Sequence, residues 1–167
     1  SSDVCSSDLV TVLDGVGAFT SATDIVVTAG DGTKQTITAE KFIINTGAEP
    51  VMPKIPGLEN NPYIYVSESL LDLDVLPERL TIIGGGYIGL EFASMFASYG
   101  SKVTVLDIFD NFLPRDDEDI SKLVRSDLES RGIIFKLGVK IDAITDNSVE
   151  IINKEGKKVS ILSDKIL

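Results

Sequence analysis

The sequence predicts an α/β fold in which a short β-rich region precedes a layered β-α-β domain. Two observations carry this prediction. Short β-type runs separated by turn residues fill the chain up to residue 46, and from residue 80 onward apolar strands alternate with segments of helical period. With 167 residues, of which 43% are hydrophobic and 25% charged, the chain can form one domain with a real core or two incomplete ones.

The pattern of the β-rich region predicts a β-meander. Strands are predicted at residues 10–13, 15–19, 25–28 and 36–38, and Gly30-Asp31-Gly32 is the clearest hairpin loop. Residues 41–45 form a continuous apolar run that predicts another strand and leads into Thr46 and Gly47. Prolines at positions 50, 53 and 56 then forbid regular structure, so a connector follows.

In the second half of the chain the spacing of apolar residues changes from that of strands to that of helices alternating with strands. Ser67 can cap a short helix over residues 67–73. Residues 80–83 predict a buried strand, 86–99 a helix and 102–106 the next strand, which together make a β-α-β unit. Within that helix Gly89, Ala93 and Ala97 fall four apart, so the smallest side chains form one column and the helix can lie close to a sheet.

A second helix is predicted at residues 116–131. Four acids in its first turn complement the helix dipole, which we favour over a metal site, and Gly132 lies just past its end. Strands follow at 133–136, 140–145, 149–153 and 158–162, and residues 164–167 begin one more.

Composition excludes several functions. The formal net charge of −11 disfavours a nucleic-acid partner, and no apolar run is long enough to span a membrane, so we expect a cytoplasmic protein. One cysteine, Cys5, and no histidine exclude an internal disulfide, a Cys/His zinc site and any histidine-dependent triad. Residues 1–9, SSDVCSSDL, resemble a translated sequencing adapter and are expected to be non-native, the alternative being an unstructured native terminus.

The stretch TIIGGGYIGLE at residues 81–91 contains the pattern Gly84-x-Gly86-x-x-Gly89. The pattern follows a strand and opens a helix, and the next strand ends in Asp107, at the distance of a ribose-binding acid. In this interpretation Gly84 permits a tight turn, Gly86 lets a pyrophosphate approach the backbone, and Gly89 permits close packing of helix on strand. A merely structural turn is the alternative.

Two other nucleotide sites fit the sequence poorly. A P-loop needs Lys-Ser/Thr after its last glycine, whereas Leu90 and Glu91 follow Gly89. A short-chain dehydrogenase needs a Tyr-x-x-x-Lys pair, and none of the four tyrosines has a lysine four residues on. The pattern therefore favours a Rossmann-like dinucleotide site.

GGGYIGLEFASMFASYGSKVTVLD, residues 84–107, resembles the NAD(P)H-binding domain of the pyridine nucleotide-disulfide oxidoreductases. FIINTGAEPVMPKIPG, residues 42–57, resembles the segment by which that family's FAD domain returns to the flavin. Within the family, FLPRDDEDI at 112–120 is most similar to the bacterial subgroup that detoxifies reactive chlorine species and hypothiocyanous acid. Mercuric reductase and dihydrolipoamide dehydrogenase are near relatives.

The resemblance implies three parts after residue 9. Residues 10–57 would be a partial FAD-binding domain, with the β-meander and a return strand, and residues 58–78 a connector. Residues 79–167 would form a Rossmann-like three-layer NAD(P)H-binding domain, truncated at its C-terminus. Because the family's FAD glycine motif lies at the chain start, the motif here is expected to hold NAD(P)H and not FAD.

The resemblance also implies roles for single residues. Asp107 would bind the adenosine ribose and repel the 2′-phosphate of NADPH, so NADH should be preferred at least about tenfold. Tyr87, beside Ile88 in the motif, would cover the nicotinamide pocket, the alternative being plain packing. Glu91 would lie near the nicotinamide and the flavin and is the one catalytic candidate.

Thr46 and Gly47 would contact FAD, or only pack. In the family, hydride passes from NADH to FAD, then electrons pass to a Cys-x-x-x-x-Cys disulfide and a substrate, with a histidine from the other subunit of a homodimer. The chain has neither the cysteine pair nor the histidine. We therefore expect an interior fragment that is inactive alone, the alternative being a stand-alone NAD-binding or sensing module.

Overall fold

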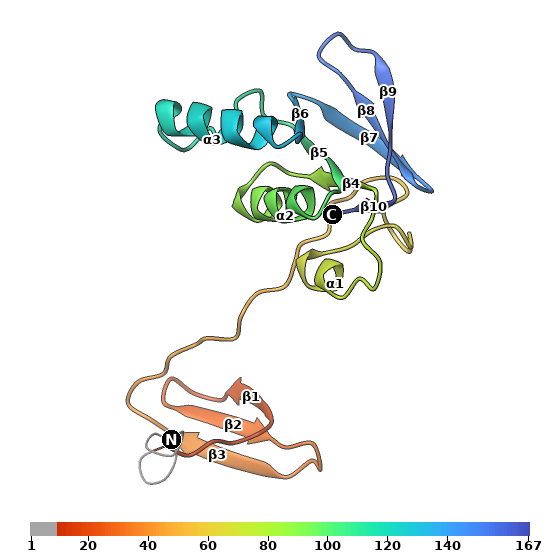
Figure 1. The fold of residues 1–167 in the computed structure, drawn as a ribbon. Coiled ribbons are helices and arrows are strands. Elements are labelled where there is room, and N and C mark those ends of the chain that lie inside the picture. Colours follow the sequence, from red (N-terminus) through yellow and green to blue (C-terminus); the bar gives the residue numbers. More distant parts are fainter. Residues whose placement is uncertain (1–9) are drawn as a thin grey trace. The chain divides into compact units, whose positions relative to one another are not determined.

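The structure, a computed structural model, describes residues 10–167 and divides into two units (Figure 1). The first unit ends at Glu49 and the second runs from Pro50 to Leu167. The segment predicted to be non-native, residues 1–9, lies outside the described residues. None of the helices formed by residues 10–167 is long and apolar enough to cross a membrane.

The first unit is an antiparallel sheet in the order β1-β2-β3. Its strands are β1 (Val16–Phe19), β2 (Asp24–Thr28) and β3 (Lys34–Thr38). Gly32, with a φ of 85°, lies in the turn between β2 and β3, where the sequence predicts the hairpin loop. The β-meander is therefore confirmed.

Two strand predictions in the first unit are wrong. Residues 10–13 and 41–45 have no regular structure, although their composition is β-rich. A strand needs a neighbour to pair its backbone N–H and C=O groups, and the described residues offer these segments none. Most of their apolar side chains stay accessible, with Ile43 95% exposed, whereas Phe42 is half-buried and packs against Phe19.

The second unit is built around a parallel sheet in the order β10-β4-β5-β6, with an antiparallel sheet β7-β8-β9 beside it. The parallel strands are β4 (Arg79–Ile83), β5 (Lys102–Asp107), β6 (Ile134–Leu137) and β10 (Lys165–Ile166). The antiparallel strands are β7 (Lys140–Thr145), β8 (Ser148–Ile152) and β9 (Lys158–Leu162). The helices are α1 (Ser67–Leu71), α2 (Tyr87–Ser98) and α3 (Glu118–Ser130).

Side chains on the parallel strands point alternately into two cores. Leu80, Ile82 and Val105 pack in a cluster with buried residues of α2 and α3. Ile83 and Leu106 pack in a second cluster with residues of β7, β8 and β9. Because neighbouring strand residues face opposite sides of a sheet, these two clusters mark three layers: helices, parallel sheet and antiparallel sheet. The three-layer α/β fold is confirmed.

The ends of the helices follow the predicted signals only in part. Of the four acids expected in the first turn of α3, only Glu118 and Asp119 lie in it, because the helix begins at Glu118. Asp117 caps α3, since its carboxylate accepts hydrogen bonds from the N–H groups of Asp119 (3.0 Å) and Ile120 (3.4 Å). Ser67 was predicted to cap α1 but is its first helical residue, and Val66 is the cap residue. Val66 has no side-chain oxygen, and its N–H instead donates to Ser69 Oγ (3.0 Å).

An ion pair between Arg79, the first residue of β4, and Asp164, which directly precedes β10, joins these two strands. Asp164 accepts hydrogen bonds from the backbone N–H of Arg79 (2.8 Å) and from its guanidinium (2.6 Å). The hydrogen bonds from Arg79 lower the pKa of the Asp164 carboxyl below its ordinary value. The pair therefore stabilises the fold only while Asp164 is ionised.

We expect Asp164→Asn to lower the urea midpoint of unfolding at pH 7. A lowered native pKa contributes stability above the unfolded-state pKa, near 3.9, and loses it as the pH falls through the native value. The difference between the two unfolding midpoints should therefore shrink as the pH falls below about 4. Urea titrations across this range measure the difference, and a gap that persists at the acid end would contradict the assignment.

Candidate functional site

The glycine-rich turn joins the end of β4 to the start of α2. Gly84 has a φ of 110°, which favours glycine, and its N–H donates to the carbonyl of Leu106 (2.8 Å). A Cβ on Gly89 would overlap the carbonyl oxygen of Gly84 and lie 3.2 Å from Ile82 Cγ2. The first turn of α2 thus packs directly on the end of β4, and the structural roles predicted for Gly84 and Gly89 are confirmed.

The N-terminus of α2 is left without a side-chain cap. Gly86 is the cap residue, no side chain accepts from the first turn, and that turn contains no acid. By contrast, α3 is capped by Asp117 and has Glu118 and Asp119 in its first turn. A Cβ on Gly86 would meet nothing within 4 Å. Among the described residues the first turn of α2 thus has no side-chain acceptor, and there is free space beside Gly86, a combination that suits a phosphate.

Asp107 ends β5 and faces the same turn. Its Oδ2 accepts a hydrogen bond from the Gly85 N–H (2.7 Å), and its Oδ1 accepts one from the Phe109 N–H (2.9 Å). These bonds fix the carboxylate beside the glycine turn, and each oxygen keeps a lone pair for a further donor. The sequence predicts the position of Asp107. It does not predict the hydrogen bond from the Gly85 N–H to the Asp107 carboxylate, because the two residues are 22 positions apart.

Tyr87 and Ile88 begin α2, and their side chains are largely exposed, at 64% and 62%. The Tyr87 hydroxyl donates to both carboxylate oxygens of Asp116, 2.9 Å away in each case. This hydrogen bond, together with the negative charge of Asp116, raises the pKa of the Tyr87 phenol. Asp116 was not predicted as a partner of the motif, since no sequence signal links residues 29 apart.

Glu91 lies in the second turn of α2 and is exposed. Within residues 10–167, Glu91 makes neither an ion pair nor a side-chain hydrogen bond. Solvent takes the place of a partner, because the side chain lies on the accessible side of the helix.

Thr46 and Gly47 belong to the first unit, where both are exposed in an irregular segment. Gly47 has a φ of 76°, and a Cβ there would meet nothing within 4 Å. Their contacts with FAD stay predictions. Residues 10–167 contain no cluster of three or more His, Cys, Asp or Glu suited to a metal.

Comparison with known proteins agrees with this geometry. The model of the family described as pyridine nucleotide-disulphide oxidoreductase matches residues 5–167. The chain is 42% identical over 144 residues to the probable pyridine nucleotide-disulfide oxidoreductase RclA of Escherichia coli, covering 85% of this chain and 32% of that protein. It is 37% identical over 141 residues to dihydrolipoyl dehydrogenase of Chlamydia muridarum, covering 84% and 30%.

A solved structure shares the fold. The HOCl-induced flavoprotein disulfide reductase RclA from Escherichia coli superposes with a TM-score of 0.78 and 39% identity, over 94% of this chain and 35% of that one. The chain thus spans about a third of the length of the relatives it matches.

Proposed function

The chain belongs to the pyridine nucleotide-disulphide oxidoreductase family, whose members are oxidoreductases, and we propose that residues 79–167 are its NAD(P)H-binding domain with a preference for NADH. One observation supports this most. The uncapped N-terminus of α2 lies opposite the carboxylate of Asp107, which Gly85 and Phe109 hold in place. One group can receive a pyrophosphate and the other a ribose.

Several residues of the turn and of its neighbourhood then have a binding role. The N–H groups at Gly86, Tyr87 and Ile88 donate to the pyrophosphate, and no side chain at Gly86 obstructs its approach. Asp107 accepts hydrogen bonds from the ribose hydroxyls and repels a 2′-phosphate. NADH, once bound, supplies a hydride for transfer to a flavin. Glu91, exposed one turn further along α2, is proposed to lie beside the nicotinamide.

The activity of a protein as long as the relatives is part of the same proposal. We propose that this domain serves an FAD-dependent, homodimeric oxidoreductase of the cytoplasm, which reduces a disulfide or a related oxidant. Thr46 and Gly47 are proposed as flavin contacts. The 167-residue chain has a single cysteine and so cannot form the family's disulfide pair within itself. We therefore expect it to bind NADH but not to oxidise it when FAD is added.

We expect the 167-residue chain to bind NADH at least about tenfold more tightly than NADPH, since a charge-assisted hydrogen bond contributes about 1.5–3 kcal/mol. Asp107→Asn should remove most of this preference, because the amide no longer repels a 2′-phosphate and binds the ribose less strongly. Titrations that follow nicotinamide fluorescence measure both dissociation constants, and the chain has no tryptophan to interfere.

The matched control is Asp127→Asn, which removes the same charge in the last turn of α3 and breaks an ion pair with Arg131 (2.6 Å). This variant should keep the preference of the parent chain. A folded chain that binds neither dinucleotide would contradict the proposed function. NADH oxidation by the chain with added FAD would instead contradict the expectation that it is inactive alone.

A further inference from the structure

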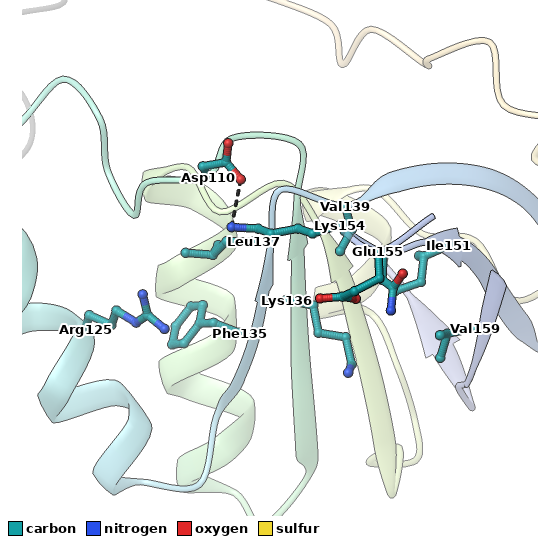
Figure 2. A pocket seen from close by; sticks show the side chains of 11 residues that line it. Asp110, Arg125, Phe135, Lys136, Leu137, Val139, Ile151, Lys154, Glu155 and Val159 are labelled. Carbon is teal, nitrogen blue, oxygen red and sulfur yellow. Dashed lines mark ion pairs between the residues drawn. The ribbon is translucent and has the colours of Figure 1, made fainter. Parts of the chain in front are cut away.

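An ion pair joins the segment after β5 to the turn between β8 and β9. Lys154 Nζ lies 2.7 Å from Asp110 Oδ1 (Figure 2). Asp110 follows Asp107 by three residues, so their Cα atoms are at most about 11 Å apart. We propose that Lys154 is a specificity-determining residue, which sets the preference between NADH and NADPH by neutralising Asp110; this inference rests on the proposed function.

Backbone hydrogen bonds hold the segment that carries both acids. The Val139 N–H donates to the carbonyl of Asp107 (3.0 Å), and the Gly138 N–H donates to the carbonyl of Phe109 (2.9 Å). The Phe109 N–H in turn donates to the Asp107 carboxylate. The connection between β6 and β7 therefore fixes the path of the chain from Asp107 to Asp110.

The ion pair lies directly over Gly138. A Cβ at this position would overlap Asp110 Oδ1 and lie 2.5 Å from Lys154 Cε, and the φ of 67° also favours glycine. Absence of a side chain here leaves room for the side chains of Asp110 and Lys154 to meet. The antiparallel sheet thus contributes a cation to the edge of the parallel sheet where Asp107 lies.

Lys154 is the cation that is bonded to this segment. The pair borders a cavity of about 340 Å³, which Arg125 and Lys136 also line (Figure 2). Arg125 is paired with Glu129 along α3 (2.8 Å). Lys136 makes no ion pair with any of the residues 10–167.

Charge at positions 110 and 154 should act more on NADPH than on NADH. NADPH carries an additional phosphate on the ribose that Asp107 is proposed to hold, and a surface charge is felt over about 10 Å at 0.1 M salt. With Lys154 in place, Asp110 adds little net charge there. An unpaired Asp110 would repel the 2′-phosphate, and an unpaired Lys154 would attract it.

Two substitutions break the same ion pair with opposite changes of charge. Asp110→Asn frees Lys154 and should reduce the preference for NADH about threefold, whereas Lys154→Gln exposes Asp110 and should increase it about threefold, as expected for a largely exposed pair. The double variant should return to the ratio of the parent chain. Fluorescence titrations of the 167-residue chain with NADH and NADPH measure the ratios, and both shifts should shrink in about 1 M salt.

Lys157→Gln is the control, because it removes the same charge from the same turn and Lys157 makes no ion pair with the described residues. Of the three single variants, Lys157→Gln should change the ratio of the NADH and NADPH dissociation constants least. Equal shifts in the same direction for Asp110→Asn and Lys154→Gln would show a purely mechanical role and overturn the inference, as would unchanged ratios. A parent chain that binds neither dinucleotide would overturn the proposed function as well.

Discussion

Gly86→Val is expected to weaken NADH binding at least about a hundredfold while leaving the chain folded. The valine side chain would occupy the open space before the first turn of α2, where the pyrophosphate is proposed to lie. Loss of two hydrogen bonds to a charged acceptor costs roughly 3–6 kcal/mol. Gly86 has a φ of −76° and a ψ of 177°, which valine adopts readily, so the backbone imposes no strain.

Fluorescence titration with NADH measures the loss, and urea unfolding tests whether the variant is folded. Replacement of glycine at a helix cap should lower stability by about 1 kcal/mol at most. A Gly86→Val chain that binds NADH as tightly as the parent would place the pyrophosphate elsewhere and contradict the proposed site. Loss of the fold would show instead that the space before α2 is filled by the protein itself.

The parts of the fold that depend on local sequence could be predicted. The change from period 2 to period 3.6 near residue 80 identified β4, α2 and β5 to within one residue, and Gly132 marked the end of α3. Each of these signals lies inside the element that it predicts. The wrong strands at 10–13 and 41–45 show the limit of such signals, because a strand exists only when a second strand pairs with it.

In the candidate site, too, local sequence features could be predicted and contacts between distant residues could not. The glycine spacing and the acid at the end of the next strand predict which residues would face a dinucleotide, because both follow from the geometry of a β-α-β unit. The contacts that hold these residues join distant parts of the chain, as in Tyr87 with Asp116 and Asp110 with Lys154. No periodicity encodes such contacts, and only the packed structure brings them together.

Gly89→Ala should destabilise the second unit by about 2 kcal/mol, although the same change normally stabilises a helix. In the interior of a helix without a clash, alanine is more favourable than glycine by about 1 kcal/mol. Here the new Cβ would overlap the carbonyl oxygen of Gly84, a backbone atom that cannot rotate away. Overpacking typically costs about 1–3 kcal/mol. Overlap with a backbone atom puts this site at the upper end of that range, and subtracting the helix gain of about 1 kcal/mol leaves a net loss of about 2 kcal/mol.

Urea unfolding of Gly89→Ala and Gly86→Ala measures this effect. Both variants add the same methyl group, at positions three residues apart, so their unfolding midpoints can be compared directly. At Gly86 the added methyl meets nothing within 4 Å, so only the weaker cap lowers the midpoint, by the equivalent of about 1 kcal/mol at most. At Gly89 it should fall clearly, and the melting temperature should drop by roughly 5–10 °C. A more stable Gly89→Ala chain would mean that α2 can move away from β4, in which case the uncapped first turn of α2 is not held against Asp107 by this contact.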